Sequence, residues 1–256
     1  MKAAAFEVHN PATLDAALAA AAQGARIFAG GQSLGPMLNL RVARPATLAP
    51  VARLPELNGA SEDAGYVTLG AAVTHAAIED GRTPDLSGGI LRRIASGVAY
   101  RAVRNRGTIG GSLCHADPAA DWVTTLTALR ARVVIAGRDG RREQTVEHFV
   151  RGAYQVALAP GEIVCAVRIP KSGVAARFGY CKFCRKPGEF AHAMAAVLIE
   201  GPRRRAAIGA TGGAPLALED DAVSSEGLRR AGLEGLALAM QSAALARALG
   251  ETETRV

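Results

Sequence analysis

The residues that decide the fold are Arg26 to Leu40, which read RIFAGGQSLGPMLNL, and Arg104 to Leu113, which read RNRGTIGGSL. In the first stretch, residues 26–29 predict a buried strand, and Pro36 favours a short helix after the glycine pair. Successive glycines let the backbone approach a ligand and turn several N–H groups toward one point, and a helix start adds partial positive charge. Each glycine pair alone is equally consistent with a tight turn. Two such loops together match the two phosphoryl groups of a diphosphate.

The familiar nucleotide-binding signatures are absent from both glycine loops. A P-loop ends in Gly-Lys-Ser/Thr, and the Rossmann fingerprint reads G-x-G-x-x-G after the first strand. Neither pattern occurs at residues 26–40 or 104–113. A cofactor phosphate bound here therefore requires a different fold.

The composition predicts a folded protein in the cytoplasm. Of 256 residues, 49% are hydrophobic and only 4% aromatic, which argues against reading single-stranded nucleic acid by base stacking. The net charge of +7 is spread over short arginine clusters, so no nucleic-acid partner is expected. The longest alanine-rich stretch, residues 16–22, is too short to insert into a membrane, and no secretory signal is evident. Four cysteines do not form a disulfide framework.

Apolar periodicity and turn residues place the expected elements along the chain. Helices are predicted over residues 14–22, 74–79, 91–98, 121–129 and 233–249. Strands are predicted over residues 3–8, 26–29, 66–69, 132–136, 162–169, 177–183, 190–199 and 206–210. Asp117 and Asp121, spaced i, i+4 beside Pro118, are expected to cap and start the helix at 121.

In these two loops the sequence resembles the flavoprotein (medium) subunits of molybdenum hydroxylases. That family includes the xanthine dehydrogenase FAD domain and the carbon monoxide dehydrogenase medium subunit. Residues 29–34 followed by Pro-Met-Leu-Asn-Leu-Arg resemble its first FAD-pyrophosphate loop, and residues 104–113 followed by His-Ala-Asp-Pro-Ala-Ala-Asp resemble its second. Further agreement lies at residues 161–164 and 168–170, at Tyr180, Lys182 and Arg185, and at 190–191. The resemblance spans roughly residues 3 to 215.

The resemblance implies an α+β fold, namely a two-part FAD-binding module of the vanillyl-alcohol oxidase (PCMH) type followed by a small α/β C-terminal domain. The FAD-binding domain is expected over residues 1–173, with subdomains of about 1–55 and 56–173. The C-terminal domain, expected over 174–256, lacks the Asp-Ile-Arg and Tyr-Arg pattern of the family and is expected to be shortened.

The resemblance also implies which residues bind FAD non-covalently. Backbone N–H groups of both loops and the hydroxyls of Ser33 and Ser112 would hold the diphosphate, Asp121 would contact FAD, and Val164 and Lys182 would lie near it. The full set implied is Ala29, Gly30, Gly31, Gln32, Ser33, Leu34, Thr108, Ile109, Gly110, Gly111, Ser112, Leu113, Asp121, Val164 and Lys182. The arginines of residues 101–106 are a candidate to balance the diphosphate charge.

The implied function is electron transfer within a three-component enzyme. Electrons would pass from a molybdopterin-binding large subunit through a [2Fe-2S] small subunit to FAD and then to an external acceptor, in what is expected to be a dimer of heterotrimers. No catalytic residue and no metal site are expected on this chain, because the cofactor carries the chemistry. A stand-alone FAD oxidoreductase of the same fold and a flavin-free assembly subunit are the alternatives.

Several side chains invite other interpretations. Cys181 and Cys184 have the spacing of a metal or dithiol pair, but a zinc site needs about four ligands and no second close pair exists. Cys114 with His115 could suggest a nucleophile, although no acid–base partner can be assigned. His75 is expected to be a surface or structural residue. These residues remain outside the predicted site.

Overall fold

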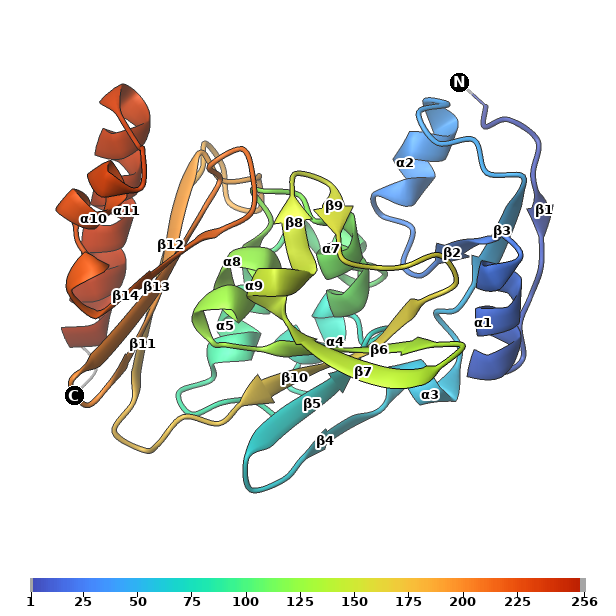
Figure 1. Ribbon diagram of the computed structural model, residues 1–256, viewed down its shortest axis with the longest axis horizontal. Helices are drawn as coiled ribbons and strands as arrows, with labels where there is room; N and C mark the ends of the chain where they lie inside the picture. Colours follow the sequence, from blue (N-terminus) through green and yellow to red (C-terminus); the bar gives the residue numbers. More distant parts are fainter. Residues whose placement is uncertain (1, 254–256) are drawn as a thin grey trace.

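The computed structural model describes residues 2–253, and these residues build sheets of three, five and four strands along the long axis of the molecule (Figure 1). The N-terminal sheet lies at one end, the five-stranded sheet in the middle and the C-terminal sheet at the other end. A further pair of short strands, β8 (Val150–Gly152) and β9 (Gln155–Val156), lies beside the central layer.

The N-terminal layer is a small parallel sheet of order β1-β3-β2. It comprises β1 (Glu7–Val8), β2 (Arg26–Phe28), β3 (Thr47–Pro50), α1 (Leu14–Ala22), α2 (Leu34–Asn39) and α3 (Pro55–Asn58). Helix α1 begins where the Thr13 hydroxyl accepts a hydrogen bond from the Ala16 N–H at 3.2 Å, an N-cap that satisfies a donor of the first turn. Leu14 and Ala17 of α1 share a hydrophobic cluster with Ile163, so this layer packs on the central one.

The central layer is an antiparallel sheet of order β4-β5-β10-β6-β7. Its strands are β4 (Ala60–Glu62), β5 (Tyr66–Gly70), β6 (Arg132–Gly137), β7 (Gly140–Thr145) and β10 (Ile163–Pro170). Its helices are α4 (His75–Glu79), α5 (Ile90–Ser96), α6 (Arg101–Arg104), α7 (Ile109–His115), α8 (Asp121–Ala128) and α9 (Val146–Phe149). Helix α8 is buried along its whole length, because it contacts β12 and β13 of the next layer as well as α5, α7 and α9 of its own layer.

The C-terminal layer is an antiparallel sheet in sequential order, β11-β12-β13-β14. It contains β11 (Arg177–Phe183), β12 (Ala193–Glu200), β13 (Arg203–Gly209), β14 (Leu216–Glu219), the 3-10 helix η1 (Asp220–Ala222), α10 (Ser225–Arg230) and α11 (Gly235–Glu253). Strand β12 is covered on both faces, by α8 on one side and α11 on the other, which explains its nearly unbroken apolar sequence.

Most predicted elements exist, but some of their bounds and the burial of one strand differ from the prediction. The helix at 14–22 and the strand at 177–183 have the predicted bounds, whereas the strand predicted over 3–8 is reduced to β1. Strand β2 is exposed or half-buried instead of buried, because it lies at the edge of the small N-terminal sheet. The part of the C-terminal domain beyond residue 253 lies outside the described residues.

Candidate functional site

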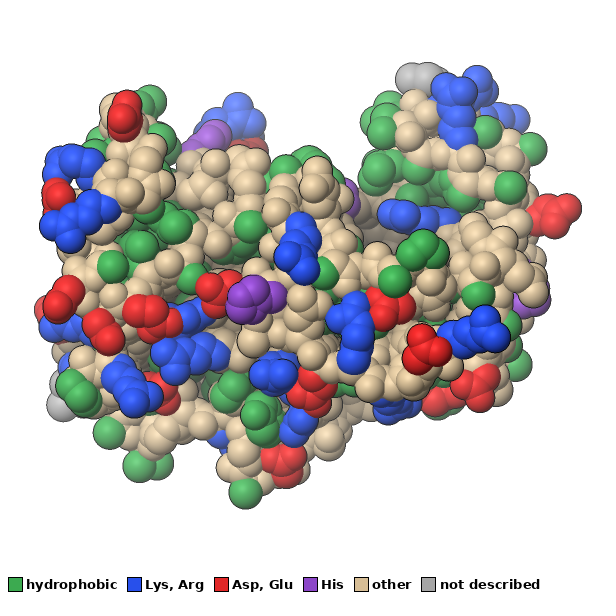
Figure 2. Space-filling model, viewed as in Figure 1, with side chains coloured by type: hydrophobic (Ala, Val, Ile, Leu, Met, Phe, Trp, Pro, Cys, Tyr) green, Lys and Arg blue, Asp and Glu red, His purple; other side chains and the backbone are tan. Residues whose placement is uncertain are grey.

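The fold brings the two glycine loops side by side. A Cβ atom built on Gly30 would collide with the carbonyl oxygen of Arg106, so only glycine lets the first loop lie against the second. A Cβ atom on Gly111 would lie 4.0 Å from that of Ala29. Figure 2 shows that the surface is hollowed between the lobe that carries α2 and the central body. The loops, at the junction of these two layers, therefore form one candidate site.

The first loop offers a run of free donors. The N–H groups of residues 30–34 have no hydrogen-bond acceptor within residues 2–253, and the Ser33 hydroxyl has no partner there either. Gly31 adopts φ +72°, a left-handed conformation that L side chains rarely take, and this conformation turns the backbone within the loop. The Gln32 side-chain amide donates to the Gly30 carbonyl at 3.0 Å and braces the loop. Successive unpaired amides of this kind are the groups from which proteins build anion-binding sites.

The second loop differs from its prediction, because its backbone amides are already used. Residues 109–115 form α7, so the glycine pair lies in the first turn of a helix. The N–H groups of residues 109–112 donate to the Val73 carbonyl, the Ala71 carbonyl, the Thr108 hydroxyl and the Thr108 carbonyl, at 2.9–3.1 Å. What remains for a ligand is the Thr108 N–H and the Ser112 hydroxyl, neither of which has a partner among the described residues.

The apolar members of the predicted site lie in the core beneath the second loop. Ile109 and Leu113 are fully buried, and Val164 on β10 is 4% exposed in the same hydrophobic cluster. Helix α7 packs on β10, which places the glycine turn over the central sheet. These residues therefore support the shape of the loop from below.

Asp121 and Lys182 form a buried ion pair between the central and C-terminal layers. Lys182 Nζ donates to Asp121 Oδ1 at 2.7 Å and to the Gly97 carbonyl at 2.9 Å, with both charged side chains less than a tenth exposed. The Tyr180 hydroxyl donates to the same Asp121 oxygen at 2.7 Å. Tyr180 and Lys182, two residues apart on β11, thus point to the same face of the strand and grip one carboxylate.

The expected capping role of Asp121 is wrong. Ala120 occupies the N-cap of α8, no side chain caps that helix, and the Asp121 carboxylate points to β11. Asp117 closes the preceding turn, where its carboxylate accepts from the Ala119 N–H at 2.9 Å, and it also accepts from the Tyr154 hydroxyl at 3.1 Å. The carboxylate pairs across the layers because leaving a buried charge without a cation costs more free energy than leaving a helix N-terminus without a side-chain cap.

His75 and Trp122 support the second loop from behind. Trp122 Nε1–H donates to His75 Nδ1 at 3.1 Å, and the His75 N–H donates to the Gly107 carbonyl at 2.9 Å. A Cβ atom at Gly107 would lie 2.9 Å from the imidazole ring, so the backbone before Thr108 rests on it. Burial, together with the Arg104 charge, lowers the pKa of His75 to about 4. The ring is therefore neutral at physiological pH, and no sequence signal indicated this support.

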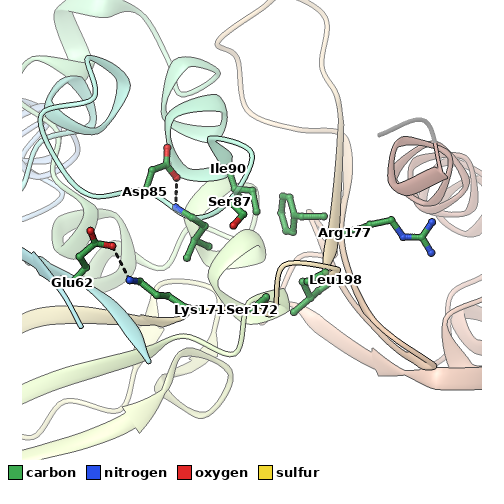
Figure 3. A pocket seen from close by; sticks show the side chains of 12 residues that line it. Glu62, Asp85, Ser87, Ile90, Lys171, Ser172, Arg177 and Leu198 are labelled. Atoms are coloured by element: carbon green, nitrogen blue, oxygen red, sulfur yellow. Dashed lines mark hydrogen bonds and ion pairs between the residues drawn. The ribbon is translucent and has the colours of Figure 1, made fainter. Parts of the chain in front are cut away.

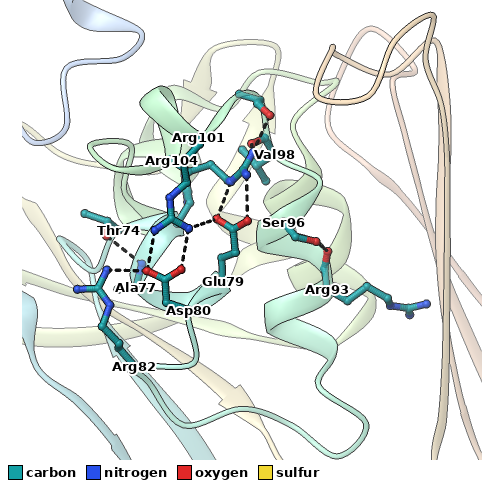
Figure 4. Close-up of polar contacts among 12 residues, drawn as sticks. Thr74, Ala77, Glu79, Asp80, Arg82, Arg93, Ser96, Val98, Arg101 and Arg104 are labelled. Carbon is teal, nitrogen blue, oxygen red and sulfur yellow. Dashed lines mark hydrogen bonds and ion pairs between the residues drawn. The ribbon is translucent and has the colours of Figure 1, made fainter.

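Two of the arginines proposed to balance a diphosphate are already neutralised. Arg104 forms a two-pronged ion pair with Glu79, and Arg101 forms one with Asp80 (Figure 4). Arg101 also donates to Glu79, so the four side chains form one network that joins α4 to α6. The expectation fails for these two because the fold places carboxylates opposite them.

Two other arginines beside the loops are free. Arg26 and Arg106 are exposed and have no carboxylate partner within residues 2–253. Arg26 begins β2, which leads into the first loop, and Arg106 immediately precedes the second loop. They replace Arg101 and Arg104 as the cations closest in the chain to the free amides.

The four cysteines are free thiols in this fold. Burial raises the pKa of the Cys114 thiol to about 12 although Arg26 opposes the shift, which disfavours the thiolate that a nucleophile needs. Cys181 and Cys184 are free and partly buried. Within residues 2–253, no cluster of three or more His, Cys, Asp and Glu residues could hold a metal ion. None of the helices described in this range could cross a membrane.

Two cavities lie away from the glycine loops. One of about 230 Å³ is lined by the connection after β10, the start of α5 and β11, and contains the Lys171–Glu62 ion pair at 2.7 Å (Figure 3). None of the predicted site residues lines it. A more open cavity of about 490 Å³, next to α5 and α6, reaches only Lys182 of the predicted set.

Comparison with known proteins identifies the family. The family described as the FAD binding domain in molybdopterin dehydrogenase matches residues 4–172, about two thirds of the chain. The chain belongs to this family. The expected α+β FAD-binding module is confirmed, and so is the sequence resemblance to molybdenum hydroxylase flavoproteins.

Relatives of this FAD-binding family align over most of the chain. The alpha subunit of the 6-hydroxypseudooxynicotine dehydrogenase complex of Paenarthrobacter nicotinovorans is 33% identical over 225 residues, which cover 85% of this chain and 76% of the relative. The carbon monoxide dehydrogenase medium chain of Hydrogenophaga pseudoflava is 35% identical, and the aligned residues cover 76% of this chain and 69% of the relative. These names describe dehydrogenase subunits, so the family is one of oxidoreductases.

Solved structures of this family superpose along the whole chain. Quinoline 2-oxidoreductase from Pseudomonas putida 86 gives a TM-score of 0.87 at 32% identity, covering 99% of both chains. Carbon monoxide dehydrogenase from Hydrogenophaga pseudoflava gives 0.86 at 30% identity, covering 100% of this chain and 99% of the other. The C-terminal layer is therefore part of the shared fold.

Proposed function

We propose that this chain is the FAD-carrying, electron-transferring subunit of a three-component molybdenum hydroxylase. The observation that carries the proposal is the run of unpaired N–H groups at residues 30–34, beside a loop against which only glycine can pack. A protein that bound no anionic group would leave these five donors to water alone. The residues present therefore fit the diphosphate of FAD.

The first loop would bind the diphosphate through residues 29–34, including the Ser33 hydroxyl. The second loop, residues 108–113, would contribute the Thr108 N–H and the Ser112 hydroxyl, since its other amides are occupied. Arg26 and Arg106 would supply the balancing charge, because no carboxylate within residues 2–253 neutralises them. Asp121 and Lys182 would contact the cofactor, with Val164 packed below it.

FAD, when bound, accepts and releases electrons through its isoalloxazine ring. The chain would hold it without a covalent bond, orient it through two fixed loops and exclude water with the apolar floor of α7 and β10. Lys182 is held by Asp121 and Gly97, so its charge has a fixed position. The chain needs no general acid or base for this task.

The proposed assembly assigns substrate oxidation to other subunits. Relatives are named as medium chains or subunits of dehydrogenase complexes, which supports a molybdopterin-binding large subunit and a [2Fe-2S] small subunit as partners here. We assign residues 1–173 to cofactor binding, with subdomains of about 1–55 and 56–173, and residues 174–256 to a smaller C-terminal domain. A dimer of heterotrimers in the cytoplasm, with electrons leaving to an external acceptor, completes the proposal.

Two alternatives make different predictions. A stand-alone FAD oxidoreductase would oxidise an organic substrate without partner subunits. A flavin-free assembly subunit would remain colourless after incubation with FAD. The subunit proposal requires bound flavin and no substrate turnover by the chain alone.

The test is reconstitution of the purified chain. We expect the chain to bind FAD, to give a flavin spectrum and to oxidise organic substrates only after the adjacently encoded iron–sulfur and molybdenum subunits are added. Gly31→Val should lower FAD retention at least tenfold, because the side chain would press on Phe28 and cannot adopt φ +72° without strain. Gly59→Ala is the matched control, since Gly59 has an ordinary φ of −65° and open space around it.

The charge assignment has its own matched pair. Arg26→Gln should weaken FAD binding more at low salt than at high salt, because an exposed charge is screened. Arg101→Gln should leave FAD affinity unchanged, since Arg101 is paired with Asp80. A colourless protein that takes up no FAD would overturn the proposal, and equal effects of both arginine variants would remove Arg26 from the site.

A further inference from the structure

We propose that Tyr180 is a positioning residue: its hydroxyl fixes one oxygen of Asp121 so that the other oxygen is available to the cofactor. This inference rests on the proposed function, because it assumes that Asp121 contacts FAD. It adds a residue of the C-terminal layer that itself need not touch the cofactor. Two sets of contacts and the protonation state of the hydroxyl support it.

The first set divides the two oxygens of the Asp121 carboxylate. Oδ1 accepts from the Tyr180 hydroxyl and from Lys182 Nζ, both at 2.7 Å. Oδ2 has no donor within residues 2–253. Asp121 as a whole is only 6% exposed, but Oδ2 is not among the fully buried side-chain atoms that lack a partner, so it keeps some access from outside. The geometry therefore leaves Oδ2 as the oxygen that can accept a hydrogen bond from a ligand.

The second set fixes Tyr180 itself. Strand β11 is the edge of its sheet, and the Tyr180 N–H donates on its open side, away from β12. Its acceptor is Glu251 Oε2 in the last turns of α11, at 3.1 Å. Arg93 of α5 donates to the same oxygen at 2.7 Å. The backbone of Tyr180 is thus tied to two helices from different layers.

The third support is the proton of the Tyr180 hydroxyl. Burial and the neighbouring Asp121 charge raise the pKa of Tyr180 well above its usual value of 10, and Cys181 and Cys184 act in the same direction. The hydroxyl therefore stays protonated at neutral pH and remains a hydrogen-bond donor. Without it, Oδ1 would keep only Lys182, whose flexible side chain defines an orientation less well than a rigid phenol.

The experiment compares FAD dissociation constants of the full chain, measured by quenching of flavin fluorescence, for four variants. Tyr180→Phe should weaken FAD binding about tenfold, in the range of a hydrogen bond to a charged group. Asp121→Asn should weaken it at least as much, and the double variant should be no weaker than Asp121→Asn alone. Tyr100→Phe is the control, because Tyr100 is 61% exposed and its hydroxyl has no partner in the described chain.

A second readout separates positioning from general stability. Tyr180→Phe should also shift the visible absorption spectrum of bound FAD, which a loss of stability alone would not move. If Tyr180→Phe alone fails to fold, the double variant is used, because it also removes the Asp121 carboxylate that has lost a donor. Comparing the double variant with Asp121→Asn then tests the same coupling between the two residues. Any further weakening in that comparison would show that Tyr180 acts independently of Asp121 and would overturn the inference.

The outcomes also separate this inference from the proposed function. If the unmodified chain binds no FAD, the proposed function fails. If FAD binds and Asp121→Asn weakens it while Tyr180→Phe matches the parent in affinity and spectrum, only the positioning role of Tyr180 fails.

Discussion

His75 shows how one residue couples burial to the predicted cofactor site. It is 5% exposed, accepts a hydrogen bond from Trp122, and carries the backbone that leads into the second loop. The sequence left open whether it is a surface or a structural residue, and its burial makes it a structural one. Because Nδ1 accepts from the indole, a protonated imidazole would lose that bond and place a charge in the core beside Arg104.

This environment predicts that stability falls between pH 6.5 and 4. The folded pKa of about 4 lies below the ordinary value of 6.5, so the unfolded chain binds more protons in that window and stability decreases as pH falls through it. The contribution is complete above pH 6.5 and is lost by about pH 4, at most roughly 3 kcal/mol. Urea denaturation of the flavin-free chain between about pH 4 and 8 measures it.

The matched variant for this prediction is His75→Gln, which keeps a hydrogen-bond acceptor for Trp122 but does not titrate. It should be less stable than the parent near neutral pH and should lose less stability as the pH falls from 6.5 toward 4. Carboxylates whose pKa is lowered by ion pairs, such as Glu79 and Glu143, act mainly at lower pH. Identical pH profiles for parent and variant would contradict the assignment.

At the scale of elements, the two glycine loops use the same sequence pattern differently. The first remains an open loop before α2, whereas the second is the capped start of α7. The difference lies in Thr108, whose hydroxyl accepts from the Gly111 N–H at 3.1 Å, and in Val73 and Ala71, whose carbonyls accept the amides of residues 109 and 110. A glycine pair becomes helical where acceptors of this kind are supplied.

Removing the cap should therefore destabilise α7. Thr108→Val keeps the volume of the side chain and deletes the acceptor, so the free energy of unfolding should fall by about 1–2 kcal/mol. Thr108→Ser restores the hydroxyl and should recover most of the loss. Chemical denaturation of the flavin-free chain checks both values, and equal stability of the Val and Ser variants would exclude the cap as the cause.

At the scale of the whole molecule, the candidate site lies where layers meet. The first loop belongs to the N-terminal layer, the second to the central layer, and the partners of Asp121 to the C-terminal layer. The layers share hydrophobic contacts, such as α1 with the cluster around Ile163 and α8 with β13. If FAD is held by residues of all three layers, as proposed, it adds a further connection between them.

FAD should consequently stabilise the chain as a unit. At a free concentration about 100 times the dissociation constant, bound FAD should raise the free energy of unfolding by about 2.7 kcal/mol. A thermal melt followed by circular dichroism, with and without FAD, measures the shift in midpoint. Gly31→Val should show little shift, while Gly59→Ala should behave like the parent. A parent midpoint that does not respond to FAD would contradict the placement of the site between layers.

The sequence by itself determined the family and most of the elements. The two loop motifs act through short-range requirements, namely glycine where the backbone must turn or approach, and these requirements can be read residue by residue. The periodicity of α1 was equally legible, since it buries the stripe of Leu14, Ala17 and Ala20. The charged strand β7 was not found, because its pairing with β6 and not its own composition makes it a strand.

Only the tertiary structure decided which groups of the site are free. Sequence spacing treated the amides of both loops as equivalent donors, assigned Asp121 to a helix cap and counted Arg101 and Arg104 as available charge. The fold occupies the amides of residues 109–112, turns Asp121 toward Tyr180 and Lys182, and places Glu79 and Asp80 opposite the two arginines. Hydrogen-bond and charge pairing depend on partners brought from distant positions, and linear spacing does not contain that information.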